Sequence, residues 1–321
     1  MDISVVLTTY NGESFLKEQL DSILIQTLPP KEIIVVDDCS TDSTYEILKS
    51  YANIYSIVKV FRNEINLGAH QNFRKAFSLS TCPLIAPSDQ DDIWRADKLE
   101  LMKRILIERN VNLVYSQENI MWENGEMELD VHEMPDMKDF IWGNCLKGHT
   151  FLFRRELLDV FDVVKSLSFD YALAIRACIT EKYASTNETL SIWRRHNGVM
   201  TTAVSCNSEL VIQKISKWKK VKYAFCNLNK ERSKPMETSF RDRSKIFSNL
   251  NVLDSKMNTT LSKICDNIAK QSRISLIKAS ILNLVVQHYE GGLTNRIGHA
   301  MWAIRQPWIY WYDMHKLHAL E

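Results

Sequence analysis

The chain has 321 residues, of which 45% are hydrophobic and 10% aromatic, which excludes a disordered protein and allows one large domain with an appendage or two domains. Seven scattered cysteines without a Cys-x-x-Cys pair are typical of reduced thiols in a cytosolic protein and argue against a zinc site. The net charge of +1 hides an asymmetry: residues 1–200 carry 21 Lys/Arg and 30 Asp/Glu, whereas residues 201–321 carry 19 and 9. We therefore expect a first domain over residues 1–202 and a basic C-terminal region over residues 203–321.

Neither a leader sequence nor a membrane span is expected. Residues 1–4 run directly into a strand pattern instead of a basic and then apolar leader. The most apolar stretch, residues 274–286, is too short to cross a bilayer and contains Lys278 and Asn283. These features predict a cytoplasmic protein.

Strand and helix patterns alternate over the first 115 residues. Continuous β-branched and apolar runs predict buried strands at residues 3–7, 32–36, 57–61, 84–86 and 113–115. Apolar residues at helical spacing predict helices over residues 13–28, 43–48, 72–79 and 96–107. This alternation indicates an α/β fold with a doubly wound sheet.

Polar clusters follow three of these strands. They lie at residues 8–12 (Thr-Thr-Tyr-Asn-Gly), 37–42 (Asp-Asp-Cys-Ser-Thr-Asp) and 88–92 (Ser-Asp-Gln-Asp-Asp). Because ligands of such sheets bind beyond the carboxyl ends of the strands, we expect the three clusters to share one site.

The last of these clusters places three carboxylates, Asp89, Asp91 and Asp92, within four positions. Their mutual repulsion favours a compensating cation, so a divalent metal that binds phosphate is the first hypothesis, and an acidic turn in water is the alternative. The motifs GxxxxGK[ST], GxGxxG, GxSxG and HExxH are absent, which disfavours phosphate-loop ATPases, dinucleotide oxidoreductases, nucleophile-elbow hydrolases and zincins.

The second half of the first domain is less regular. Residues 117–139 are acidic and turn-like, with a hairpin signal at Asn124-Gly125, and predict a solvated loop or a mobile lid. Residues 150–153 predict a strand, residues 169–175 predict the start of a helix, and residues 190–193 predict a last strand.

The C-terminal region changes to a basic, helical pattern. Helices are expected over residues 211–225, 240–253 and 261–288. In the tail, residues 297–317, Trp302, Trp308 and Trp311 lie among cations, which suits a membrane interface or packing against the first domain or a partner subunit.

Four segments, in order, resemble family 2 glycosyltransferases of the GT-A fold. They are residues 5–12, 35–42, 66–68 (Asn-Leu-Gly) and 88–94 (Ser-Asp-Gln-Asp-Asp-Ile-Trp). The Asp-Gln-Asp-Asp-Ile-Trp form and the later Trp193-Arg194-Arg195-His196 are similar to bacterial rhamnosyltransferase-like enzymes of surface-polysaccharide synthesis. The resemblance covers residues 3 to about 200 and implies a Rossmann-like mixed sheet flanked by helices, with a mainly α-helical C-terminal extension.

The resemblance also implies a nucleotide-sugar donor, a divalent cation (Mn²⁺ or Mg²⁺) and an inverting transfer. Thr8 and Tyr10 would line the nucleoside site, with Tyr10 stacked on the base. Asp38 would accept the imide N–H of uracil or thymine, which favours a UDP or dTDP donor. Capping of the next helix is the alternative role for Asp37 and Asp38.

The acidic cluster would bind the rest of the donor. Asp91 would hold the metal, Asp89 would contact the ribose or the metal's outer shell, and Gln90 would contact the donor. His196 would reach back to the metal or the diphosphate, and Arg194 or Arg195 would reach the diphosphate. His196 is otherwise an ordinary hydrogen-bonded polar residue.

An inverting transfer requires a base on the acceptor hydroxyl. Asp170 matches the family's position for that base, and the alternative is a first-turn acid favoured by the helix dipole. Gly148-His149 resembles the acceptor-side segment, which makes His149 a candidate acceptor contact.

The sequence therefore predicts a glycosyltransferase that acts on a saccharide or lipid-linked glycan, with peripheral contact to the inner face of the cell membrane and no nucleic-acid partner. The alternative is a non-catalytic scaffold that binds nucleotide-sugars or glycans. A nucleotidyltransferase is disfavoured because the glycine-rich loop expected after the first strand is missing.

Overall fold

A computed structural model describes residues 1–135, 140, 146–164, 167–195, 221, 234–249, 255–286, 301–309 and 311. The chain divides into two compact units. Unit 1 comprises Met1–Met134, Asn144–Asp159 and Ser168–Thr202, and unit 2 comprises Pro135–Gly143, Val160–Leu167 and Ala203–Glu321. Unit 2 thus begins its main segment after residue 202 but also takes two short segments from the expected first domain.

Unit 1 is built on one mixed sheet with the strand order β3-β2-β1-β4-β8-β6-β9-β5, and β7 pairs with β6 outside this path. The strands are β1 (Ile3–Thr9), β2 (Glu32–Asp37), β3 (Val58–Arg62), β4 (Leu84–Ser88), β5 (Asp92–Trp94), β6 (Leu113–Met121), β7 (Met127–Asp130), β8 (Phe151–Arg154) and β9 (Tyr183–Arg194). Strands β1 to β4 are mutually parallel, whereas β8 runs antiparallel to β4 and β6. The continuous apolar runs of β1 and β2 are buried along their whole length, as expected of strands covered on both faces.

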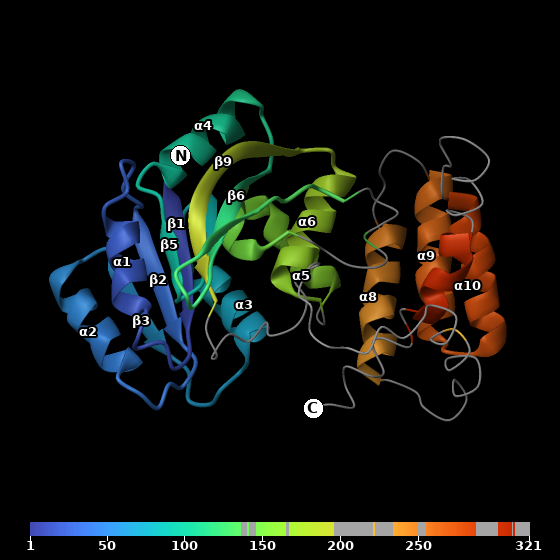
Figure 1. Ribbon diagram of the computed structural model, residues 1–321, viewed down its shortest axis with the longest axis horizontal. Helices are drawn as coiled ribbons and strands as arrows, with labels where there is room; N and C mark the ends of the chain where they lie inside the picture. The colour runs from blue at the N-terminus through green and yellow to red at the C-terminus, as the bar shows by residue number, and fades with distance from the viewer. Residues whose placement is uncertain are drawn as a thin grey trace. The chain divides into compact units, whose positions relative to one another are not determined.

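Helices cover both faces of this sheet (Figure 1). They are α1 (Leu16–Leu24), α2 (Thr44–Ile54), α3 (Ala69–Leu79), α4 (Lys98–Glu108) and α6 (Phe169–Ile179). Leu152 of β8 belongs to a core with Leu16 and Leu99, from α1 and α4. The next residue, Phe153, contacts Phe77 of α3 with ring centres 5.8 Å apart. Because successive strand residues point to opposite faces, α1 and α4 lie on one face and α3 lies on the other.

Most predicted elements of unit 1 are confirmed, and one prediction is wrong. The acidic residues 117–130 are not a solvated loop: β6 continues to Met121, the chain turns at Asn124-Gly125 with Gly125 at φ 83°, and β7 returns antiparallel. Glu118, expected in water, is fully buried in β6. Asp92 begins β5, which pairs with β9, so the acidic turn in water given as the alternative does not hold for this residue.

Unit 2 contains α5 (Val160–Val163), α8 (Lys234–Asn249), α9 (Ser255–Ala269) and α10 (Arg273–Val286), and residues 301–309 are also helical. The single helix expected over residues 261–288 is two helices with a break between Ala269 and Arg273. The helix expected over residues 211–225 lies outside the described residues except at position 221.

The aromatic tail packs within unit 2. Trp308 and Trp311 are buried, and Trp308 Nε1 donates to Ser280 Oγ of α10 over 3.2 Å. Asn283 Nδ2 donates to the Ala303 carbonyl over 3.0 Å. Trp308 therefore packs on α10 of the same unit, which is neither the membrane interface nor the contact with the first domain or a partner subunit that the sequence suggested. Among the described helices, none has the length and apolar character to cross a membrane.

Candidate functional site

The three polar clusters meet at one edge of the sheet. The parallel register pairs Thr9 of β1 with Asp37 of β2, and Leu7 of β1 with Ser88 of β4. The carboxyl ends of these three strands therefore lie side by side, as the strand pattern predicted. Thr8, the predicted nucleoside contact, is buried near the end of β1.

Two hydrogen bonds of Gln90 link the acidic cluster to the loop after β1. Its Nε2 donates to the Tyr10 carbonyl over 3.0 Å, and its Oε1 accepts from the Tyr10 N–H over 2.9 Å. A Cβ on Gly12 would lie 2.2 Å from Gln90 Oε1, so a larger residue there would displace the Gln90 amide from these two hydrogen bonds. The Tyr10 residue is 47% exposed and its ring is available for stacking, whereas the amide of Gln90 is already engaged.

Asp38 lies beneath the Asn66-Leu67-Gly68 turn. Its Oδ1 accepts from Asn63 Nδ2 (2.6 Å) and the Leu67 N–H (2.8 Å), and its Oδ2 accepts from the Gly68 N–H (2.8 Å). The residue is 2% exposed. Asp38 therefore orders the turn before α3, and recognition of uracil or thymine by this carboxylate stays a prediction.

Arg194 holds the backbone of the acidic cluster. Its Nε donates to the Asp91 carbonyl over 2.7 Å, its Nη2 donates to the Asp92 carbonyl over 3.3 Å, and its Nη1 pairs with Glu18. This engagement gives Arg194 a positioning role and leaves little of the guanidinium for a diphosphate. Arg195 lies over the ring of Trp193, with Cζ 4.2 Å from the ring centre. His196 lies outside the described residues.

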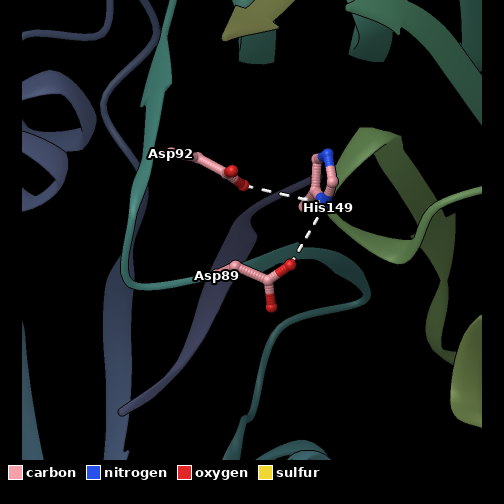
Figure 2. A group of neighbouring side chains, drawn as sticks. All are labelled: Asp89, Asp92 and His149. Atoms are coloured by element: carbon pink, nitrogen blue, oxygen red, sulfur yellow. Dashed lines mark hydrogen bonds and ion pairs between the residues drawn. The ribbon is translucent and has the colours of Figure 1, made fainter. Parts of the chain in front are cut away.

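The His149 imidazole lies beside two carboxylates of the acidic cluster, those of Asp89 and Asp92 (Figure 2). Its Nδ1 is 3.1 Å from Asp89 Oδ2 and 3.7 Å from Asp92 Oδ2, and its Nε2 hydrogen-bonds to Glu118. The imidazole is buried, so in this structure it presents no open face to an acceptor. Lys98, also buried, donates from Nζ to the His149 carbonyl over 2.7 Å.

Burial and charge determine the protonation states in this network. Burial disfavours an imidazolium, but the carboxylates of Asp92 and Glu118 outweigh it and raise the pKa of His149 well above its usual value. Burial opposes ionisation of Glu118 as well, yet His149 and His132 hold the pKa of Glu118 well below its usual value. Burial lowers the pKa of Lys98 to about 8. Glu118 and His149 are therefore an ion pair at neutral pH.

Asp170 is the second residue of α6, as predicted. Its Oδ1 accepts from the Tyr171 N–H over 2.8 Å. Burial raises the pKa of Asp170, and the negative charge of Asp89 raises it further, while His70 opposes the shift. The interaction with Asp89 places Asp170 near the acidic cluster. A carboxylate with a raised pKa suits the proton acceptor that an inverting transfer needs.

A divalent cation fits the donor set of the acidic cluster. One ligand atom each from Asp89, Asp92 and His149 lies within 4.8 Å of the others. In the part of the chain that the structure describes, neither oxygen of Asp92 has a hydrogen-bond partner, although the side chain is buried. Carboxylate oxygens are the ligands that Mn²⁺ and Mg²⁺ prefer, so Asp89 and Asp92 fit such an ion, whereas His149 would first have to lose its Nδ1 proton. Asp91, the predicted ligand, is 9% exposed in the same loop.

Sequence reasoning missed Glu118. The signal available was Asn124-Gly125, because a hairpin turn implies strands on both sides and so makes residue 118 part of a strand. The residues that contact Glu118 are far apart in the sequence, so the network itself carries no sequence pattern.

Comparison with known proteins identifies this architecture. Residues 4–161 match the family model for glycosyl transferase family 2. Over this segment, just under half of its length, the chain is similar to glycosyl transferase family 2. It is 34% identical over 123 residues to the putative teichuronic acid biosynthesis glycosyltransferase TuaG of Bacillus subtilis (strain 168), a match that covers 38% of this chain and 49% of TuaG. It is 32% identical over 161 residues to the dTDP-rhamnosyl transferase RfbG of Shigella flexneri, a match that covers 48% of this chain and 56% of RfbG.

The chain spans about half the length of these curated relatives. Among solved structures, residues 1–349 of Staphylococcus aureus TarS in complex with UDP-GlcNAc align with a TM-score of 0.56 and 17% identity, covering 100% of this chain and 92% of that one. At this identity the likeness concerns the fold, and the GT-A prediction is confirmed.

Proposed function

We propose that the chain is an inverting, metal-dependent glycosyltransferase that moves a sugar from a UDP- or dTDP-linked donor to a saccharide or lipid-linked glycan in surface-polysaccharide synthesis. The observation that carries the proposal is the arrangement of the sheet edge, where Gln90 ties the loop of Asp89 and Asp91 to the backbone of half-exposed Tyr10. The names of the relatives support the donor class, because RfbG is a dTDP-rhamnosyl transferase and TarS was crystallised with UDP-GlcNAc.

The donor would lie across this edge. Tyr10 would stack on the base beside Thr8, and Asp89 would bind the ribose hydroxyls. Asp91 and His196 would hold the divalent metal. The metal would neutralise the negative charge of the diphosphate. Arg194 would keep Asp91 in place through the backbone bond to its carbonyl.

Asp170 would accept the proton of the acceptor hydroxyl. The acceptor oxygen then forms a bond to the anomeric carbon while the bond from that carbon to the nucleoside diphosphate oxygen breaks, so the configuration inverts. The partly buried position of Asp170 limits its hydration, and its raised pKa makes it a better proton acceptor than an ordinary aspartate.

Donor turnover tests this proposal directly. We would measure nucleoside diphosphate release from a panel of UDP- and dTDP-sugars with Mn²⁺ or Mg²⁺, for wild type, Asp91→Ala and Asp170→Asn. Glu108→Gln, at the exposed end of α4, is the matched control and should keep full turnover. Loss in both site variants supports the roles, equal turnover in all the proteins overturns them, and no turnover with any donor favours the scaffold alternative.

Peripheral contact with the membrane is the second part of the proposal, since a lipid-linked acceptor would lie there. Residues 201–321 carry 19 Lys/Arg and 9 Asp/Glu. Ile274, Ile277 and Ile281 on α10 are 69%, 45% and 57% exposed. Basic residues and exposed apolar side chains together favour an anionic lipid surface.

A further inference from the structure

Glu118 belongs to none of the sequence motifs, yet three cationic or ionisable side chains converge on it. Its Oε1 accepts from Lys147 Nζ over 2.6 Å and lies 3.1 Å from His132 Nε2, and its Oε2 bonds to His149 Nε2. Lys147 also pairs with Asp130 at 2.6 Å. A fully buried carboxylate with this many partners has a single side-chain position.

That position in turn fixes His149. Glu118 holds the imidazole at Nε2, and Lys98 holds the backbone carbonyl of the same residue. The remaining ring nitrogen, Nδ1, points at the acidic cluster and lies 3.1 Å from Asp89 Oδ2. Figure 2 shows Asp89 and Asp92 on adjacent sides of this nitrogen.

Of the three residues Glu118, His149 and Asp89, only Asp89 has a substantial exposed surface. Its side chain is 42% exposed, whereas the side chains of His149 and Glu118 are 5% and 0% exposed. An exposed aspartate ordinarily samples several rotamers, so a contact from a fixed imidazole selects one of them. The network therefore leads from the core of the sheet to a carboxylate on the donor side.

The turn that carries His149 also contacts α6, the helix that contains Asp170. A Cβ on Gly148 would lie 2.2 Å from Cε2 and Cζ of Phe169, the residue before Asp170. The turn that carries His149 thus packs directly against the start of α6. One short segment contacts the elements that carry both Asp89 and Asp170.

We propose that Glu118 and His149 are positioning residues, in which Glu118 orients the imidazole and the imidazole holds Asp89 in the rotamer that binds the donor. The inference rests on the proposed function and deepens it, because it assigns a role in donor binding to residues outside the motifs. Stability alone does not require this ion pair, since apolar side chains of similar volume stabilise a core as well as buried ion pairs do.

The test compares wild type, Glu118→Gln, His149→Gln and the double variant in the full-length chain. Titration calorimetry with UDP and dTDP in the presence of Mn²⁺ gives Kd, and donor turnover gives kcat and KM separately. Glu32→Gln is the matched control, because Glu32 is also a buried carboxylate of the sheet, bound by Ser4, Lys59 and Thr81. Thermal unfolding of all variants reports how much stability each one loses.

We expect each single variant to raise the nucleotide Kd and the donor KM about 10- to 100-fold, the range for losing a hydrogen bond to a charged group. Glu118 acts through His149, so the double variant should lose no more than His149→Gln alone. Glu32→Gln should lose stability while nucleotide Kd stays at the wild-type value.

Two results would overturn the inference, and they differ from failure of the proposed function. If wild type binds and turns over donor while His149→Gln matches it, the imidazole does not position Asp89. If the losses of the two single variants add up in the double variant, Glu118 acts independently of His149. If wild type neither binds a nucleoside diphosphate nor turns over any donor, the proposed function fails and the inference fails with it.

Discussion

At the scale of single residues, the aspartates of the site differ in exposure, in hydrogen bonding and in their place in the fold. Asp89 is part-exposed and held by an imidazole, Asp92 is buried without a hydrogen bond, and Asp170 opens a helix. Burial raises the pKa of both Asp92 and Asp170. Only Asp170 combines a raised pKa with a place at a helix start near the donor edge, so it suits the base.

Asp170→Asn should lower kcat by about 10²- to 10⁴-fold and leave nucleotide Kd unchanged, because the amide keeps the shape but cannot accept the proton. In wild type, kcat/KM should fall as the pH drops through the pKa of Asp170, and this loss should begin above the usual aspartate range because the pKa is raised. A pH–rate profile with the best donor measures both effects. An acid limb at the ordinary aspartate value would contradict the assignment.

Glu32 provides a prediction about stability. Burial alone would raise its pKa, but hydrogen bonds from Lys59, Ser4 and Thr81 lower it from 4.5 to about 2. A lowered folded-state pKa stabilises the fold above pH 4.5, and this contribution is lost as the pH falls towards 2. Glu32→Gln should therefore reduce the free energy of unfolding by about 3 kcal/mol at pH 7 and by much less near pH 2.

Denaturant unfolding of wild type and Glu32→Gln at several pH values measures this difference. Glu46→Gln is the control, because Glu46 forms only an exposed ion pair with Lys49 at the surface. Such pairs contribute about 0–1 kcal/mol, so little change is expected. A Glu32→Gln difference that does not depend on pH would show that the carboxylate's charge is not what stabilises the fold.

At the scale of elements, the apolar runs of β1, β2 and β4 predicted buried parallel strands because such strands are apolar on both faces. The polar residues at their ends predicted the location of the site. Glu118 was misplaced because it is an acid inside a strand, where the gain from long-range partners outweighs the cost of burial. Those partners come from other segments, and a local pattern does not contain them.

The turn before β8 provides a prediction for an element. Gly148→Ala would place a Cβ 2.2 Å from the Phe169 ring, and the rigid ring can move only with the start of α6. We expect a loss of about 1–3 kcal/mol from overpacking and a decrease in kcat, because Asp170 moves with Phe169. Denaturant unfolding and donor turnover give the two values.

Gly125→Ala is the matched control for that experiment. Apart from its chain neighbours, no described atom lies within 4 Å of the position that a Cβ on Gly125 would take, but its φ of 83° disfavours alanine, so stability should fall by about 1 kcal/mol. Turnover per folded molecule should stay at the wild-type value in this control. Equal turnover in Gly148→Ala and Gly125→Ala would contradict the coupling between the turn and Asp170.

At the scale of the whole molecule, the two parts of the chain differ in charge and in fold. Residues 1–200 carry the mixed sheet and an acidic balance, and residues 201–321 carry a basic balance with helices α8, α9 and α10. The burial of Trp308 and Trp311 removes two of the aromatic residues that suggested a membrane interface. What remains in favour of lipid contact is the basic charge and the exposed isoleucines of α10.

The full-length chain should therefore bind vesicles that contain anionic lipid and bind neutral vesicles weakly. Each basic residue near an anionic surface contributes about 1 kcal/mol, and screening should reduce the binding as salt increases. Replacement of Ile277 and Ile281 by serine should weaken the binding further, because their apolar surface is exposed on α10. Replacement of Ile25 and Ile54, which lie in unit 1 and are 67% and 72% exposed, should leave the binding unchanged. Co-sedimentation of the four combinations of lipid and salt measures these effects, and equal, negligible binding to both kinds of vesicle would exclude the membrane contact while leaving the transfer reaction in place.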